Sequence, residues 1–284
     1  MRKLIIVSVL LAGGIIAYPQ TRDVKQINKL TKKETALEPL HFLASDELKG
    51  RSPRRPEIDI AANYIADYFK KAGVSQINGA PDYFQQAELK LKIKDSSKPQ
   101  EIIQGKNVIG LIQGTDDNLK NQYIVLSAHY DHIGVTTQPK EINGKLDSIF
   151  NGARDNAIGV TGVLNAAKYF AKYPPKRSVL FILYTGEEMG LLGSKYFSEH
   201  PVVPINQIVF NLNIDNGGYN DTTVAMVIGL GRTSADDDLR AACAAYNLTA
   251  IADQVPELNL FDRSDNLNLA KHGVPSPTFG MGVR

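Results

Sequence analysis

A six-residue apolar run at positions 179–184, VLFILY, constrains the fold of this 284-residue chain more than any other stretch. β-Branched and aromatic residues are mixed into the run, and turn residues border it. This pattern is typical of a β-strand that is buried on both faces. The run ends at Thr185-Gly186, and Glu187 and Glu188 follow at once. We therefore expect two adjacent carboxylates at the end of a buried strand.

Adjacent glutamates have two interpretations. Neighbouring side chains in extended backbone point to opposite sides, so Glu187 and Glu188 could reach different targets, such as a metal ion and a water molecule beside it. For an isolated Glu-Glu pair, a solvated acidic turn is the more common explanation. Other predicted strand and helix ends also carry His or Asp, and the presence of these residues at several element ends favours a functional site.

The order of the elements predicts the fold class. Apolar strands at residues 122–128 and 207–214 lead into His129 and Asp215. The connections between the apolar strands are long enough for helices, so the strands are expected to be parallel. The sequence therefore predicts an α/β fold, with a mixed, largely parallel central sheet sandwiched between helices. In such a sheet the carboxyl ends of the strands form the edge at which ligands bind.

Several other elements have clear signals. Residues 57–72 predict an amphipathic helix, which Gly73 ends. Residues 155–173 predict a helix that Pro174-Pro175 stop. Asn143-Gly144 predicts a hairpin turn. Further helices are predicted at residues 21–33, 36–49, 190–199, 234–246 and 262–272, and further strands at residues 84–93, 106–113, 222–228 and 273–281.

The first 17 residues have the character of a secretory signal peptide. Arg2 and Lys3 precede an apolar run that is too short to span a bilayer. We therefore divide the chain into a signal peptide, residues 1–17, and a mature domain, residues 18–284. We expect export to the periplasm or the extracellular space, without stable membrane association after cleavage. An uncleaved membrane anchor is the alternative.

The charge composition of the chain does not favour nucleic acid as a binding partner. The chain has 32 Lys and Arg against 30 Asp and Glu, and Arg2 and Lys3 account for the excess. The mature part is thus close to neutral, so we expect no nucleic acid or acidic membrane as a partner. The single cysteine, Cys243, cannot form an internal disulfide and is expected to be a small buried residue.

Five residues should meet at the carboxyl edge of the sheet: His129, Asp155, Glu187, Glu188 and Asp215. One imidazole and several carboxylates suit zinc or a similar cation, and crowded carboxylates repel one another without one. Two metal ions about 3.5–4 Å apart with a bridging carboxylate form a known hydrolytic arrangement. Asp131 could orient His129 from behind. Asp155, taken alone, is equally suited to a simple helix cap.

Five motifs then carry a resemblance to a known family. They are SAHYDHIG, NGARDNAIG, YTGEEMGLLGS, NLNIDNGG and RSDNLNLAKHGVP, in this order. With them the chain resembles the di-zinc exopeptidase family that includes secreted bacterial leucine aminopeptidases and glutamate carboxypeptidase II. The resemblance starts at LHFLASDELKGRS and covers nearly all of the mature domain. It implies the zinc-exopeptidase fold, which is phosphorylase/hydrolase-like.

The resemblance also implies a role for each site residue. The implied zinc ligands are His129, Asp155, Glu188 and Asp215. Asp155 matches the bridging aspartate, and Glu188 matches a ligand of the second zinc. Glu187 matches the general base that takes a proton from the attacking water, and Asp131 matches the aspartate behind the histidine. The implied reaction is hydrolysis of an N-terminal peptide bond in a peptide or small amide.

One feature of the family has no match in this chain, namely the last zinc histidine. Asn266 follows Ser264-Asp265 where some members carry that histidine, and the chain stops at Arg284 before the loop that supplies it in others. The remaining histidines are His41, His132, His200 and His272, and for these we expect solvated or loop-packing roles. We therefore expect that the C-terminal part is missing, and that two zinc sites are reduced to one intact site and one impaired site.

Two alternatives to a zinc aminopeptidase remain open. The first is a non-catalytic protein on the same fold that binds peptides or a partner. The second is a glutaminyl cyclase, which shares the fold and typically uses a single zinc. The adjacent Glu187 and Glu188 argue mildly against the cyclase.

Overall fold

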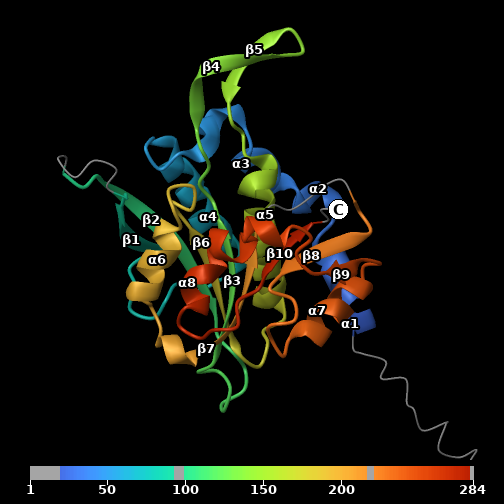
Figure 1. Cartoon of the computed structure of the whole chain (residues 1–284). Helices are drawn as coiled ribbons and strands as arrows, with labels where there is room; N and C mark the ends of the chain where they lie inside the picture. The colour runs from blue at the N-terminus through green and yellow to red at the C-terminus, as the bar shows by residue number, and fades with distance from the viewer. Residues whose placement is uncertain (1–19, 93–98, 216–220, 282–284) are drawn as a thin grey trace, which may run out of the picture.

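The computed structural model describes residues 20–92, 99–215 and 221–281, arranged as a central sheet between helices (Figure 1). The predicted signal peptide, residues 1–17, lies outside the described residues. Among the described helices, none is long and apolar enough to cross a membrane.

The described strands form a mixed eight-stranded sheet in the order β1-β2-β6-β3-β7-β10-β8-β9. Their bounds are β1 Phe84–Lys90, β2 Ile102–Ile112, β3 Tyr123–His129, β6 Ser178–Tyr184, β7 Ile208–Ile214, β8 Val224–Ile228, β9 Thr249–Ile251 and β10 Thr278–Met281. β3 pairs in parallel with both β6 and β7, and β10 pairs in parallel with β7. β1 with β2, β2 with β6 and β8 with β10 are antiparallel. The predicted mixed, largely parallel centre of the sheet is confirmed.

β6 is buried along its whole length, as its apolar run predicts. Val179, Phe181 and Leu183 point into one core, which they share with helices α4, Glu57–Ala72, and α5, Ile158–Lys172. Leu180 and Ile182 point into a second core on the opposite face, which they share with helices α6, Leu192–Glu199, and α8, Asn266–Ala270. The alternation of side chains along the strand thus gives each helix layer its own apolar surface.

The helices follow the predicted pattern closely. Their bounds are α1 Gln20–Leu30, α2 Lys33–Ala36, α3 Glu38–Leu43, α4 Glu57–Ala72, α5 Ile158–Lys172, α6 Leu192–Glu199, α7 Asp236–Ala244 and α8 Asn266–Ala270. α4 has the predicted bounds, and Gly73 ends it in the left-handed conformation at φ 81°. Cys243 is buried in α7, as expected.

Three local differences from the predictions have physical causes. The predicted helix at residues 36–49 is interrupted, because α3 ends at Leu43 and Ser45 is extended, at φ −74° and ψ 155°, before the 3₁₀ segment η1, Asp46–Arg51. The predicted helix at residues 155–173 begins only at Ile158, after the π-helical turn η2, Ala153–Ala157. β9 was not predicted, since three residues are too few to show a periodic pattern.

A two-stranded hairpin projects from the body of the molecule (Figure 1). It consists of β4, Val135–Ile142, and β5, Lys145–Ile149. The predicted turn is confirmed, since Asn143 and Gly144 both have positive φ, at 52° and 77°. The base of the hairpin is fixed to η1 by a hydrogen bond from the Gly134 N–H to the Gly50 carbonyl, 3.1 Å.

Candidate metal centre

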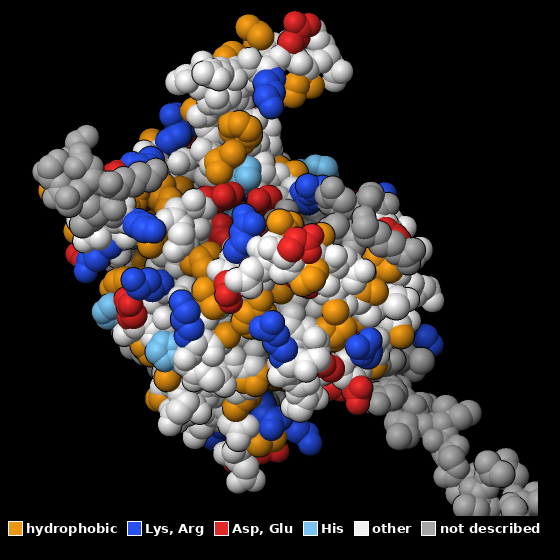
Figure 2. Space-filling view, viewed as in Figure 1, with side chains coloured by type: hydrophobic (Ala, Val, Ile, Leu, Met, Phe, Trp, Pro, Cys, Tyr) orange, Lys and Arg blue, Asp and Glu red, His pale blue; other side chains and the backbone are white. Residues whose placement is uncertain are grey.

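The predicted site residues meet at the carboxyl edge of the sheet. His129 is the last residue of β3, and Asp215 directly follows β7. Glu187 and Glu188 follow β6 after Thr185-Gly186. In the space-filling view, acidic side chains gather below the projecting hairpin, with a histidine beside them (Figure 2). The parallel strands deliver these side chains to one place, as the fold prediction requires.

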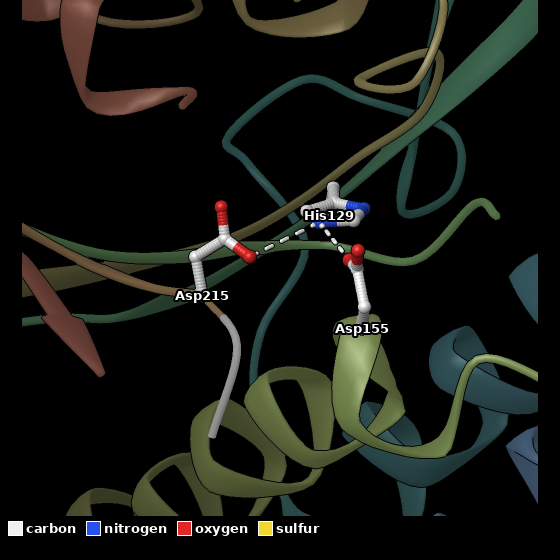
Figure 3. A group of neighbouring side chains, drawn as sticks. All are labelled: His129, Asp155 and Asp215. Carbon is white, nitrogen blue, oxygen red and sulfur yellow. Dashed lines mark ion pairs between the residues drawn. The ribbon is translucent and has the colours of Figure 1, made fainter. Parts of the chain in front are cut away.

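His129 faces two carboxylates from different elements (Figure 3). Its Nε2 lies 3.2 Å from Oδ1 of Asp155 and 3.4 Å from Oδ1 of Asp215. The ligand atoms of these three residues, which form the first group, lie within 4.8 Å of one another, a spacing that could hold a metal ion. The His129 side chain is 1% exposed, whereas that of Asp155 is 37% exposed. The group is therefore anchored in the core and open on the side of Asp155.

Asp131 lies behind His129, as predicted. Its backbone carbonyl is 3.2 Å from Nδ1 of His129, and its Oδ1 is 3.7 Å from the same atom. The Asp131 carboxylate also accepts hydrogen bonds from the backbone N–H groups of Glu187, at 3.1 Å, and Glu188, at 3.3 Å. One buried carboxylate thus holds the imidazole and the turn after β6 in a fixed relation.

Asp155 lies in an irregular turn and does not cap α5. Its φ of −119° and ψ of 94° are not helical, and the Asp155-Asn156 peptide bond is cis. Asn156 fixes the turn, because its Nδ2 donates to the Ile214 carbonyl at 2.8 Å while its Oδ1 accepts from the Gly159 N–H at 3.2 Å. The helix-cap interpretation of Asp155 is therefore wrong, and the neighbouring asparagine positions its carboxylate.

Glu188 is brought to a histidine that the sequence analysis assigned to a solvated or loop-packing role. His132 Nδ1 lies 2.7 Å from Oε1 of Glu188, and the His132 side chain is only 12% exposed. His132, Asp155 and Glu188 form a second group whose ligand atoms lie within 4.8 Å of one another. A solvated role does not fit His132, because the chain turns back after β3 and carries the ring against Glu188. The other three histidines, at positions 41, 200 and 272, are exposed, as expected.

Arg51 supports this arrangement and was missed by the sequence analysis. Its guanidinium is buried and donates to four backbone carbonyls, those of Leu43, Tyr130, Asn151 and Gly152. The Arg51 carbonyl accepts the His132 N–H at 3.2 Å. Arg51 therefore ties the loop that carries His132 to the segment that leads into Asp155. The only sequence signal was its place in the motif LHFLASDELKGRS.

The electrostatics of the site reflect buried charge. Burial acts to lower the pKa of His129, but its contacts with Asp131, Asp155 and Asp215 outweigh this effect and raise the pKa well above its usual value. Burial raises the pKa of Glu187 to about 9, and nearby carboxylates, among them Asp265, add to this.

Asp265 is a second carboxylate that the sequence analysis left without a role. It is 1% exposed, and burial raises its pKa to about 7. Among the described residues its carboxylate oxygens have no hydrogen-bond partner within normal distance. Such a concentration of buried carboxyl groups is a common property of sites that bind cations or carry out acid–base chemistry.

A pocket of about 320 Å³ opens over the two groups. Acidic residues, two arginines and a small apolar wall surround it; the lining residues are His129, Arg154, Asp155, Glu187, Glu188, Asp215, Met226, Ile228, Leu260, Arg263 and Ser264. Its volume falls within the usual range for small-molecule and cofactor sites.

Solved structures of other proteins share the fold. The aminopeptidase from Aneurinibacillus sp. strain AM-1 matches with a TM-score of 0.64 at 16% identity, covering 90% of this chain and 87% of that one. A glutaminyl cyclase from Bacteroides thetaiotaomicron matches with a TM-score of 0.61 at 18% identity, covering 87% and 83%. At these identities the likeness shows the fold alone.

Curated relatives correct the predicted location. The vacuolar membrane protease of Candida tropicalis is 29% identical over 160 residues, which are 56% of this chain and 16% of that protein. The chain thus spans only a small part of the relatives that it matches. These relatives are vacuolar membrane proteases, and this finding contradicts the expectation of a periplasmic or extracellular protein. An N-terminal basic and apolar segment does not by itself specify a final compartment.

The family is shown by the sequence that forms the sheet and its carboxyl edge. The model of peptidase family M28 matches residues 107–281, which contain β3, β6 and β7 and all the residues of both groups. The resemblance inferred from the five motifs is therefore confirmed: this chain belongs to peptidase family M28.

Proposed function

We propose that this chain hydrolyses a peptide bond at a chain terminus, as a zinc aminopeptidase. The observation that carries the proposal is the convergence of His129, Asp155 and Asp215 at the open carboxyl edge of the sheet. Membership of a peptidase family supports the reaction class. The zinc-dependent exopeptidases and aminopeptidases among the proteins of like fold support the choice of metal.

The geometry of the first group suits zinc. Bonds of about 2.0–2.1 Å from a tetrahedral zinc place two ligand atoms roughly 3.3–3.4 Å apart. Nε2 of His129 lies 3.2 and 3.4 Å from the two carboxylate oxygens that it faces. Zinc bound there would polarise a carbonyl group and make water more acidic.

Glu187 is the proposed general base. It lines the pocket beside the first group and is held at its backbone by Asp131. A base must be ionised to accept a proton, and burial raises the pKa of this carboxyl to about 9 when no cation is bound. A nearby cation favours the ionised form of a carboxyl group, so the function of Glu187 depends on metal.

Asp131 is proposed as a positioning residue for this base and for His129. It contacts the backbone of the turn that carries Glu187, and it faces the imidazole nitrogen opposite the metal group. Fixing the orientation of a ligating imidazole is a usual function of a carboxylate in this place.

The pocket also suggests a class of substrate. Met226, Ile228 and Leu260 form its apolar part, and the four carboxylates that line it outnumber the two arginines, Arg154 and Arg263. Acidic groups attract a protonated amine, and the apolar wall suits an aliphatic side chain. We therefore propose substrates with a free amino terminus and an apolar first residue.

Hydrolysis of a leucyl anilide by the zinc-loaded chain tests the proposal. Glu187→Gln should lower kcat by roughly 10²–10⁴-fold while zinc content is kept. Glu199→Gln on the exposed end of α6 is the matched control and should keep full activity. Full activity of the Glu187→Gln variant would refute the base assignment. No hydrolysis, with release of pyroglutamate from a Gln-initiated peptide, would indicate a glutaminyl cyclase instead.

A further inference from the structure

The group formed by His132, Asp155 and Glu188 is a second set of metal-ligand types beside the first. It contains one imidazole and two carboxylates, as the first group does, and Asp155 belongs to both. The carboxylate of Asp155 is also the most exposed of the first group, and it offers a ligand atom within 4.8 Å of those of His132 and Glu188. Two groups that share a carboxylate have the composition of a two-metal site.

His132 is held in place from three sides. Its backbone N–H donates to the Arg51 carbonyl at 3.2 Å, and its ring contacts Glu188. Gly152 lies against the ring, since a Cβ atom at this glycine would approach Cδ2 of His132 to 2.7 Å. A solvated surface histidine would not be enclosed in this way. The enclosure indicates that the ring has a defined place in the site.

We propose that His132 is a ligand of a second zinc ion, together with Glu188 and the shared Asp155. This inference rests on the proposed function, because it presumes that the first group binds zinc. The His132–Glu188 distance of 2.7 Å is about 0.6 Å shorter than the separation of two ligand atoms on a tetrahedral zinc. Zinc bound between these two side chains would therefore require them to move apart by that amount.

The charges around the two groups predict an order of binding. Arg51 carries a positive charge that acts on Asp131 and also on two members of the second group, Asp155 and Glu188. Among the described residues it forms no ion pair with a carboxylate. The first group instead lies close to Asp131 and Glu187. Like charges repel, so we expect the second zinc to bind more weakly than the first.

A different role for His132 makes a different prediction. If the ring only supports Glu188 through a hydrogen bond, it never contacts the metal. X-ray absorption at the zinc edge separates the two roles without any variant. Ligation by both His129 and His132 gives on average one imidazole per zinc in the two-zinc protein, whereas support alone gives half of that.

The experiment is a zinc titration of the metal-free chain, read as bound zinc and as imidazole scattering. We expect two zinc ions in the parent chain and one in His132→Ala. The matched control is His272→Ala, at an exposed histidine, which should still bind two. The inference would be overturned if a folded His132→Ala variant still binds two zinc ions, or if the parent chain binds only one. A value of half an imidazole per zinc in the parent chain would overturn it as well.

The failure of the proposed function would look different. Asp215→Asn alters the first group only and should lose the tighter zinc. If the parent chain binds no zinc, or if Asp215→Asn leaves the tighter zinc in place, the proposed function itself fails. If the tighter zinc behaves as expected and only His132→Ala has no effect, the first site stands and the ligand role of His132 is refuted.

Discussion

Ser264 donates its hydroxyl hydrogen to Oδ2 of Asp215 at 2.6 Å, and this leaves Oδ1 of the same carboxylate facing His129. The serine in turn accepts a hydrogen bond from Asn213 Nδ2 at 2.8 Å. The loop before α8 thus fixes a carboxylate at the end of β7. The orientation of the proposed ligand is a property of two elements far apart in the sequence.

Removing this hydroxyl should weaken the first metal group. Ser264→Ala frees Asp215 to rotate, so we expect zinc affinity to fall by roughly 10–100-fold. Ser276→Ala is the control, because this buried serine accepts a hydrogen bond from Asn211 but does not contact the site. Zinc titration of both variants checks the prediction, and equal affinity in the two would contradict it.

Asp131→Asn should impair the reaction more than the fold. The two carboxylate oxygens of Asp131 accept one backbone N–H each, and an amide replaces one of these oxygens by a donor NH2 group, so one of the two N–H groups loses its acceptor. We expect kcat for a leucyl anilide to fall by about 10–100-fold with little change in KM. Asp117→Asn, at an exposed aspartate far from the site, is the control. A change in KM alone would argue against a positioning role.

Gly152→Ala should disturb the second group. The residue has a φ of +60°, and a Cβ atom would meet the Asp155 carbonyl oxygen at 2.5 Å and Arg51 Nη2 at 2.6 Å as well as the ring of His132. We expect a loss of stability of about 1–3 kcal/mol from the backbone conformation alone, and a loss of the weaker zinc in addition. Gly144→Ala has φ +77° with no atom within 4 Å, so it separates the two effects. Retention of both zinc ions in Gly152→Ala would contradict this prediction.

The metal-free chain should lose stability as the pH rises. Burial raises the pKa of Asp265 to about 7 and that of Glu187 to about 9, so the folded state keeps protons that the unfolded state has released. The stabilisation that these bound protons give is fully present below about pH 4, the ordinary pKa of carboxyl groups. It is lost as the pH rises through about 7 and then about 9. The raised pKa of His129 acts in the same direction.

Thermal unfolding after chelation measures this effect. The Tm should decrease between about pH 6 and pH 9 in the metal-free chain. Zinc should reduce the slope, because a cation favours the ionised carboxylates. A Tm of the metal-free chain that rises over this range would contradict the prediction.

The sequence by itself determined the sheet and its edge. The continuous apolar run of β6 is buried on both faces, because only a strand between two helix layers can bury every residue. The parallel pairing of β3, β6 and β7 then brings His129, Glu187 and Asp215 to one edge. These features depend on the local hydrophobic pattern and on the length of the connections, and both can be read from the linear sequence.

Only the tertiary structure decided how the second group is made. His132 was dismissed because its spacing from His129 gives no indication that the ring returns to the site. The position of His132 depends on Arg51, which precedes it by 81 residues in the sequence. Arg51 donates hydrogen bonds to the carbonyls of Tyr130, Asn151 and Gly152. Contacts between such distant segments are set by packing. The sequence alone does not distinguish a buried arginine that binds carbonyls from an exposed one.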